Sequence, residues 1–295
     1  MHCPPARLTM PFSNVLHLSV VDKFAATAAA GFTEIALQPQ EIIRLHRQGV
    51  TVADLIAMAA DHGVRINRLD PLCTWNPDWQ PGNMGSAFVD DHRVSAAAFF
   101  RLAEQLGCEY MSLNATFRAG AYPHGQLVEY FADICSRARE HGLFCDLEPI
   151  PMWGVRSLEQ GWEVVRDADQ RNDGLVVDTL HFVRSQSSLD TLSLIPGDLI
   201  HCVQICDGAL PLPPGRTLEQ DCFERQWPGT GQFPLHDIIA ALHRHGGLNH
   251  QVGPEVFSAA NSELDAHQVA ALCRSSLAHY PLVGHSVPTR QPVAI

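Results

Sequence analysis

Lysine is almost missing from this chain of 295 residues, in which Lys23 is the single example. Catalysis through a Schiff base needs a reactive lysine amine, and Lys23 lies where we expect a helix to start, so this chemistry is disfavoured. The nine cysteines are odd in number and contain no Cys-x-x-Cys pair. A disulfide framework and a thiolate zinc site are therefore disfavoured as well, and we expect buried free thiols in a reduced compartment.

Long apolar runs are also missing, since no stretch approaches the roughly 20 residues needed to cross a bilayer. The first residues lack the basic start and apolar stretch of a secretory signal. A cytoplasmic location without membrane association is the resulting prediction. The net charge of −12 disfavours nucleic acid as a partner, because affinity for phosphate backbones comes mainly from Lys and Arg. We expect a small-molecule substrate, and self-association into a homo-oligomer stays open.

What the chain does contain is a regular alternation of apolar strand-like runs and amphipathic helical patterns, which is typical of βαβ units. No Gly-x-Gly-x-x-Gly follows the first run, so a dinucleotide-binding fold lacks its opening signal. We predict a single-domain (β/α)8 TIM barrel over residues 1–295, with its core at about 12–281 and an extended tail at 282–295. The expected strands lie near residues 14–19, 33–37, 64–70, 110–114, 143–148, 174–178, 199–205 and 251–256.

Three long loops follow predicted strands, at residues 73–91, 116–125 and 208–233. In a parallel barrel the segments that follow the strands lie on the active-site face. We therefore expect these loops to border the site.

Four predicted strands end on side chains that carry oxygen. They supply the carboxylates Glu148, Asp178 and Glu255 and the amide Gln204. Because the carboxyl ends of barrel strands open onto one face, we predict that these four side chains bind one divalent cation. Such oxygen ligands favour Mg2+, Mn2+ or Co2+, with Zn2+ also compatible. Any one of these acids, taken alone, is more simply explained as a solvated residue at the end of a strand. The prediction rests on the recurrence of an oxygen-bearing side chain at the ends of four strands.

Further candidates accompany these ligands. His181 follows Asp178 by three residues, and we assign it a catalytic or substrate-binding role. Arg225 precedes a Pro-Gly-Thr-Gly turn that would hold its guanidinium in place, ready to bind substrate oxygens. Asp207 lies just beyond its strand, where it would orient a ligand or cap a loop. Glu148 and Glu255 are the candidates for general base and acid.

Taken in order, these segments resemble the xylose isomerase-like TIM-barrel superfamily. Its pattern is Glu, then Asp-x-x-His, then His-x-x-Asp, then Arg-x-x-Pro-Gly-x-Gly, then Glu. Two positions depart from its sugar epimerases. Gln204 stands where most of them have histidine, and this is similar to some bacterial 3-dehydroshikimate dehydratases, as is Trp153-Gly154. Ketose 3-epimerases have a second glutamate where this chain has Gly154.

The resemblance implies proton abstraction next to a carbonyl, with the metal stabilising an enediolate. We predict an isomerase or epimerase of a sugar, cyclitol or related keto-polyol. The alternative is a metal-dependent dehydratase of the 3-dehydroshikimate or inosose type. Two further alternatives are a metal-binding subunit without catalysis and an enzyme related to endonuclease IV. The acidic charge balance opposes the last one.

Overall fold

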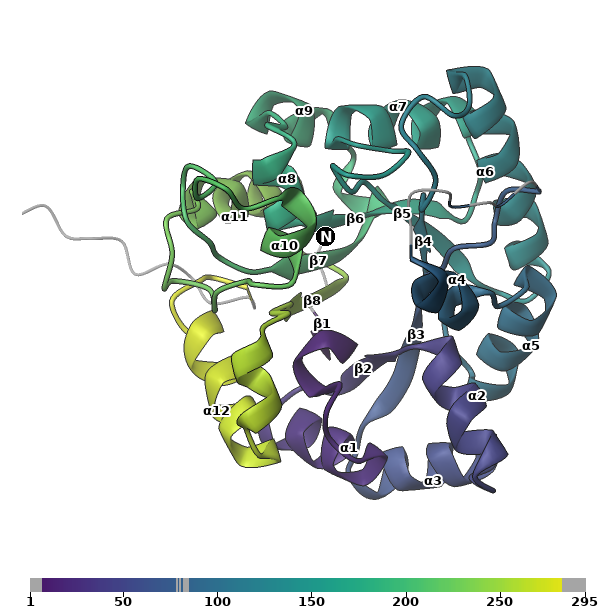
Figure 1. Ribbon diagram of the computed structural model, residues 1–295, viewed down its shortest axis with the longest axis vertical. Helices are drawn as coiled ribbons and strands as arrows, with labels where there is room; N and C mark the ends of the chain where they lie inside the picture. Colours follow the sequence, from purple (N-terminus) through teal and green to yellow (C-terminus); the bar gives the residue numbers. More distant parts are fainter. Residues whose placement is uncertain (1–6, 78, 80, 82–84, 283–295) are drawn as a thin grey trace, which may run out of the picture.

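The computed structural model describes residues 7–77, 79, 81 and 85–282. Eight parallel strands close into a barrel in sequence order, and the helices lie around it (Figure 1). This is the predicted TIM barrel. The predicted tail at 282–295 lies outside the described residues, apart from Leu282. The strands are β1 (Arg7–Met10), β2 (Glu34–Leu37), β3 (Arg65–Leu72), β4 (Tyr110–Asn114), β5 (Phe144–Glu148), β6 (Asp173–Asp178), β7 (Ile200–Ile205) and β8 (Gln251–Pro254).

Longer helices cover the outside of the barrel and bury one apolar face each, as in Leu55 and Ala59 of α3. Several of their ends follow predicted signals. Thr51 and Asp54 form the predicted capping box of α3, and Gly107 ends α5 with a left-handed φ of 69°. The outer helices are α1 (Val20–Ala29), α2 (Pro39–Arg47), α3 (Val52–Asp61), α5 (Ala96–Leu106), α6 (His124–Arg139), α7 (Leu158–Ala168), α11 (Leu235–Arg244) and α12 (Ala266–Leu277).

Short helices occur in several of the connecting segments, and between β6 and β7 they are the only helices among the described residues. The predicted long loops are partly helical, because α4 begins within 73–91 and α10 lies within 208–233. The short elements are η1 (Phe12–Val15), α4 (Ser86–His92), α8 (Thr179–Arg184), α9 (Leu189–Leu194), η2 (Gly197–Leu199), α10 (Leu218–Cys222) and η3 (Ala259–Glu263).

The first strand was predicted in the wrong place. Half of the residues at 14–19 are apolar, yet the run forms the end of η1 and the turn before α1, and β1 lies upstream of it. The side chain of buried Asn14 explains the difference, because it donates to the carbonyl of Pro254 (2.6 Å) and accepts from the backbone N–H of Val256 (2.9 Å). These long-range bonds fix the segment to the end of β8, beside the mouth of the barrel.

Two general expectations can be compared with the described part of the chain. All eight described cysteines are buried free thiols. Within the same residues no helix has the length and apolar character required to span a bilayer. The cytoplasmic location and self-association remain predictions from the sequence.

Candidate metal and catalytic site

The carboxyl ends of β5 to β8 bring the four predicted metal ligands together. Glu148 is the last residue of β5 and Asp178 the last of β6. Gln204 in β7 is in register with Asp178, and Glu255 directly follows β8. All four side chains are buried. The expectation that side chains at the carboxyl ends of the strands lie at one end of the barrel therefore holds for each of the four.

A chain of short contacts links these groups. Arg225 Nη1 donates to Asp178 Oδ2 (2.6 Å) and to Glu255 Oε2 (2.8 Å). Gln204 Nε2 donates to Glu255 Oε1 at 3.1 Å. Asp178 and Glu255 thus both accept hydrogen bonds from one nitrogen of the Arg225 guanidinium, and Gln204 joins the cluster through its hydrogen bond to Glu255.

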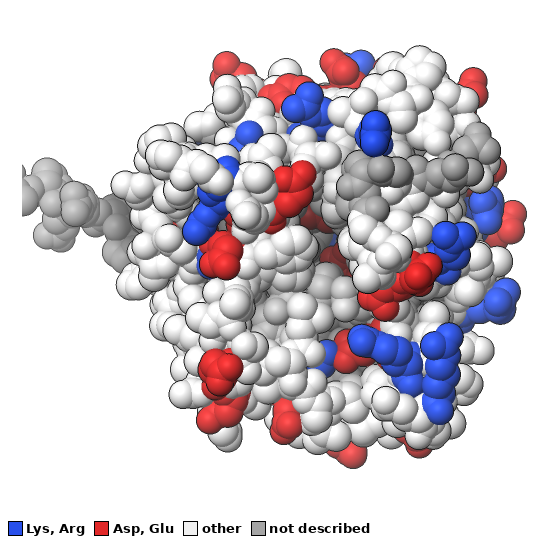
Figure 2. All heavy atoms as spheres, in the orientation of Figure 1, with Lys and Arg blue, Asp and Glu red and all other residues white. Residues whose placement is uncertain are grey.

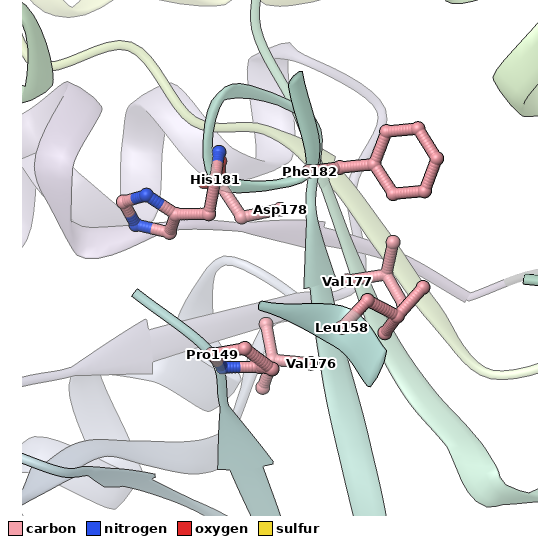
Figure 3. A pocket seen from close by; sticks show the side chains of 7 residues that line it. All are labelled: Pro149, Leu158, Val176, Val177, Asp178, His181 and Phe182. Atoms are coloured by element: carbon pink, nitrogen blue, oxygen red, sulfur yellow. The ribbon is translucent and has the colours of Figure 1, made fainter. Parts of the chain in front are cut away.

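His181 lies closer to the carboxylates than the sequence indicated. Glu148, Asp178 and His181 each offer one ligand atom, and these atoms lie within 4.8 Å of one another. His181 is in the first turn of α8, which starts directly after Asp178, and Asp178 Oδ1 accepts the backbone N–H of His181 (3.0 Å). Figure 3 shows the His181 ring and the ring of Phe182 leaving this turn on opposite sides. The helix start directly after Asp178 turns His181 toward Glu148.

Burial and mutual repulsion dominate the electrostatics of the cluster. Burial raises the pKa of Glu148 well above its usual range, and the negative charges of Asp70, Glu255 and Asp178 add to this. The pKa of Glu255 is raised well above its usual range, again mainly by burial. Burial also opposes ionisation of Asp178, but the charge of Arg225 and the hydrogen bonds to this carboxylate together outweigh burial and lower the pKa of Asp178 to about 2.

His181 is neutral at pH 7, because burial lowers its pKa to about 4. A neutral imidazole can serve as a metal ligand or can hydrogen-bond to a substrate hydroxyl. Its Nε2 lies 3.5 Å from Glu148 Oε1. Its Nδ1 is buried and has no hydrogen-bond partner within the described residues, so one ring nitrogen remains available.

The donor set fits a divalent cation. Gln204 Oε1 is buried and has no hydrogen-bond partner in the part of the chain that the structure describes. An unpaired buried acceptor costs about 1–3 kcal/mol, and a cation would satisfy it. The same ion would offset the repulsion that raises the pKa values of Glu148 and Glu255. Oxygen ligands of this kind suit a hard cation, and a histidine nitrogen makes Zn2+ compatible too.

Arg225 is buried in the site. Its guanidinium lies over the ring of Phe257, 5.1 Å from the centroid, and its Nε donates to the carbonyl of Cys222 (2.9 Å). Together with the bonds to Asp178 and Glu255, these contacts hold it in one place. Its first role is therefore to neutralise and orient two carboxylates.

Asp207 holds the loop that carries Arg225. Its carboxylate accepts backbone N–H groups from Gly208 (2.9 Å), Gly229 (3.1 Å) and Phe233 (2.9 Å). A Cβ atom on Gly231 would lie 2.4 Å from Asp207 Oδ1, so the turn needs glycine there. These contacts are those of a residue that caps a loop, and a role of Asp207 in binding a ligand stays a prediction.

A cavity of about 250 Å³ opens above the cluster and includes Glu148, Arg225 and Glu255 in its wall. Figure 2 shows this face hollowed at its centre, with acidic side chains in the depth of the hollow. The other residues of the wall are Phe12, Leu16, Gln38, Asp70, Pro71, Phe88, His92, Asn114, Ile150, Trp153, Cys222, Phe223 and Phe257.

Asp70 and Asn114 are polar residues of this wall that the sequence analysis missed. They lie toward the carboxyl ends of β3 and β4. The rule that identified Glu148, an oxygen-bearing side chain at the end of an apolar strand, applies to both. They were missed because neither belongs to the recognised pattern of motifs.

The packing around Gly154 leaves no room for the second glutamate that ketose 3-epimerases have at this position. A Cβ atom at this position would lie 2.0 Å from Cε2 of Phe117. Phe117 is buried and packs against Trp75, with ring centroids 5.8 Å apart. A glutamate at position 154 therefore requires a different arrangement of the loop after β4.

Comparisons with known proteins agree with this architecture. A sequence model of the family described as xylose isomerase-like TIM barrel matches residues 24–276. The 3-dehydroshikimate dehydratase of Pseudomonas aeruginosa is 28% identical over 251 residues, which are 83% of this chain and 38% of that protein. The inosose isomerase of Bacillus subtilis is 29% identical over 143 residues, 48% of this chain and 50% of that protein. The chain thus spans half or less of these relatives' lengths.

Solved structures share the fold. An IolI protein with a zinc atom superimposes with a TM-score of 0.78 at 20% identity, covering 92% of this chain and 97% of the other. A D-psicose 3-epimerase from Clostridium cellulolyticum H10 gives a TM-score of 0.66 at 14% identity, covering 92% and 97%. At these identities the likeness concerns the fold alone.

Proposed function

The chain belongs to the xylose isomerase-like TIM barrel family, and from this membership we propose that it is a divalent-metal-dependent enzyme that enolises a keto-polyol. The proposed reaction is isomerisation or epimerisation of a sugar, cyclitol or related polyol. The observation that carries it is the buried cluster of Glu148, Asp178 and Glu255 beside the unpaired Gln204 Oε1. Isomerase and dehydratase relatives support the class.

The proposed cation would be held by Glu148, Asp178, Gln204 and Glu255, with His181 within reach. When bound, a divalent ion supplies Lewis-acid stabilisation of negative charge on a substrate oxygen. The protein supplies the proton carriers. Glu148 and Glu255 reach the same cavity from β5 and from the residue after β8, so each can face a different side of a bound ring.

The two glutamates divide the proton transfers between them. One carboxylate takes the proton from the carbon next to the carbonyl, and the electron pair of that C–H bond moves toward the carbonyl oxygen. The other carboxyl group returns a proton. Delivery to the opposite face of the same carbon gives epimerisation. Delivery to the former carbonyl carbon, with the proton of the neighbouring hydroxyl moving to the former carbonyl oxygen, gives isomerisation.

A dehydratase is the second candidate, and Gln204 favours it, because the sequence pattern with glutamine resembles some 3-dehydroshikimate dehydratases. The relatives of that name also match more of this chain than the inosose isomerases do, at 83% against 48%. In this reaction the same proton abstraction is followed by loss of a β-hydroxyl as water. A carboxyl group on the cavity wall would protonate the leaving hydroxyl.

The test is proton exchange on the metal-loaded protein in D2O. NMR of candidate keto-polyols, including an inosose, should show loss of the signal of the hydrogen next to the carbonyl. Ultraviolet absorbance of a conjugated product, followed with 3-dehydroshikimate, identifies the dehydratase outcome instead. Removal of the ion with EDTA should abolish either signal, and added Mn2+ should restore it.

The matched variants are Glu255→Gln and Glu263→Gln. The second makes the same chemical change at an exposed glutamate in η3. We expect Glu255→Gln to lower the exchange rate by roughly 100-fold or more, as for loss of a general acid or base. Exchange that survives in Glu255→Gln at the rate of the Glu263→Gln protein would contradict the proposed role.

A further inference from the structure

A second group of polar side chains lies on the opposite side of the cavity from β6 and β7. Gln38 directly follows β2, Asp70 lies in β3 and Asn114 ends β4. All three line the cavity that also contains Glu148 and Glu255. None of them belongs to the metal-binding or proton-transfer roles proposed above, so their presence in the wall needs another explanation.

Asn114 presents an acceptor without a partner. Its side chain is 8% exposed, and Oδ1 is buried with no hydrogen-bond partner among the described residues. The residue is in register with Glu148 on the neighbouring strand, so it lies beside the proposed proton carrier. Leaving such an acceptor unpaired costs about 1–3 kcal/mol. A ligand hydroxyl that donates to Oδ1 would recover this cost.

Asp70 adds a second acceptor to the wall of the same cavity. The residue is 3% exposed, and burial raises its pKa to about 6 although Arg68 and a hydrogen bond from Ser112 oppose this. A carboxylate in this setting gains from hydroxyl donors, since a hydrogen bond to a charged group is worth about 1.5–3 kcal/mol. Adjacent hydroxyl groups on a ring would serve Asp70 and Asn114 together.

The charge of the cavity wall disfavours a ligand carboxylate close to Asp70. Among the described lining residues, Arg225 is the single guanidinium or ammonium group, and it is bonded to Asp178 and Glu255. By sequence, residues 78, 80 and 82–84 contain no Lys or Arg. A carboxylate on the ligand about 5 Å from Asp70 would be repelled by about 3 kcal/mol at an effective dielectric constant of about 20.

The rest of the wall is apolar. Phe88, Trp153 and Phe257 are among the residues that line it, and aromatic faces accept the C–H face of a polyol ring. A volume of about 250 Å³ lies just below the common range of ligand pockets, roughly 300–1,000 Å³. The space therefore suits one small ring.

We propose that Asp70 and Asn114 form a hydroxyl-binding subsite that makes this protein selective for an uncharged cyclic keto-polyol over a carboxylated one. This inference rests on the proposed function, because it names the substrate class of the same cavity. It assigns Asp70 and Asn114 to substrate recognition. The proposal also decides between the two ligand types that appear in the relatives' names, the neutral inosose and the carboxylated dehydroshikimate.

The test is calorimetric binding of two six-membered ring ligands to the metal-loaded full chain. One is a neutral inosose and the other is 3-dehydroshikimate. We expect the inosose to bind at least tenfold more tightly. Equal or tighter binding of 3-dehydroshikimate would overturn the proposal, and so would failure of both ligands to bind.

Three variants localise the effect. Asp70→Asn and Asn114→Leu should each weaken inosose binding by about tenfold, and Asp70→Asn should also narrow the preference over 3-dehydroshikimate. Asp190→Asn makes the same chemical change at an exposed position and should bind like the unsubstituted protein. Thermal unfolding of each variant checks that the fold is kept. Unchanged affinities and preference in folded Asp70→Asn would refute the subsite.

The outcome also distinguishes this inference from the proposed function. Selective binding of the inosose without exchange of its hydrogen in D2O would reject the enolising activity and leave the subsite intact. If 3-dehydroshikimate binds more tightly than the inosose and its hydrogen exchanges in D2O, the result would support the enzyme class and reject the subsite.

Discussion

Exchanging Gln204 for glutamate should lower the stability of the metal-free protein and enlarge the stabilisation that a bound metal gives. In the folded protein Gln204 Nε2 donates to Glu255 Oε1 at 3.1 Å, and Gln204 Oε1 has no partner among the described residues. Gln204→Glu replaces the donating nitrogen by a second carboxylate oxygen. The substitution keeps the length of the side chain, so its effect is mainly electrostatic.

The expected magnitude follows from the two groups that face each other. Two like charges about 4 Å apart at an effective dielectric constant of about 20 repel by about 4 kcal/mol, and the lost hydrogen bond adds about 1 kcal/mol. Protonation of one carboxyl group limits the sum, so we expect a loss of about 3 kcal/mol without metal. At roughly 2 °C per kcal/mol for a chain of this size, Tm falls by about 6 °C.

A bound divalent ion should reverse most of this loss, because it replaces the repulsion by attraction to a charged ligand. The rise in Tm on addition of saturating Mn2+ should therefore exceed that of the unsubstituted protein by about 6 °C. Thermal unfolding in EDTA and in Mn2+ measures both quantities. Gln204→Met keeps a long side chain without the amide oxygen. The rise in Tm that Mn2+ causes in this variant should be smaller than in the unsubstituted protein. Equal metal-induced rises in the three proteins would refute the placement of Gln204 at the ion.

Three further predictions concern other parts of the structure. Gly154→Ala should destabilise the protein by about 2–3 kcal/mol in urea unfolding, because its Cβ would meet the Phe117 ring, and an unchanged midpoint would contradict that packing. Asp207→Ala removes the acceptor of three backbone N–H groups, so amide hydrogen exchange within 208–233 should accelerate by about tenfold or more; unchanged exchange would show that the loop does not depend on it. Burial opposes ionisation of Glu109, but hydrogen bonds from two arginines outweigh it and lower its pKa to about 2. Since this lies below the unfolded value of about 4.3, its contribution is present above that pH and is lost as the pH falls toward 2. Glu109→Gln should therefore cost less than about 1 kcal/mol at pH 7, because the group is well exposed, and a cost that persists near pH 2 would contradict the linkage.

Much of the candidate site was predictable because strand periodicity and chain order fix the ends of parallel strands. Glu148, Asp178 and Gln204 lie at or near the ends of largely apolar runs, and the barrel places those ends together. The position of His181 near Glu148 depends on the residue at which β6 ends and α8 begins. Asp178 caps α8 through its own side chain, and this local signal was visible in the spacing.

Other features depended on contacts between distant segments. The run at 14–19 is strand-like in its apolar content, but Asn14 bonds to the backbone around Pro254 and Val256, and this pairing overrides the local preference. Asp207 was expected to orient a ligand or to cap a loop, and the three backbone donors to its carboxylate come from residues up to 26 positions away. No pattern within a single segment could indicate either set of bonds.

The sequence by itself determined the alternation of strands and helices, and with it the barrel and the end at which the carboxylates gather, because side-chain periodicity and parallel connections are local properties. The tertiary structure decided what each carboxylate meets. Arg225 is bonded to Asp178 and Glu255, Gln204 keeps one oxygen unpaired, and Asp70 and Asn114 complete the wall of the same cavity. Those are distances between side chains from separate strands and loops, and only closure of the barrel fixes them.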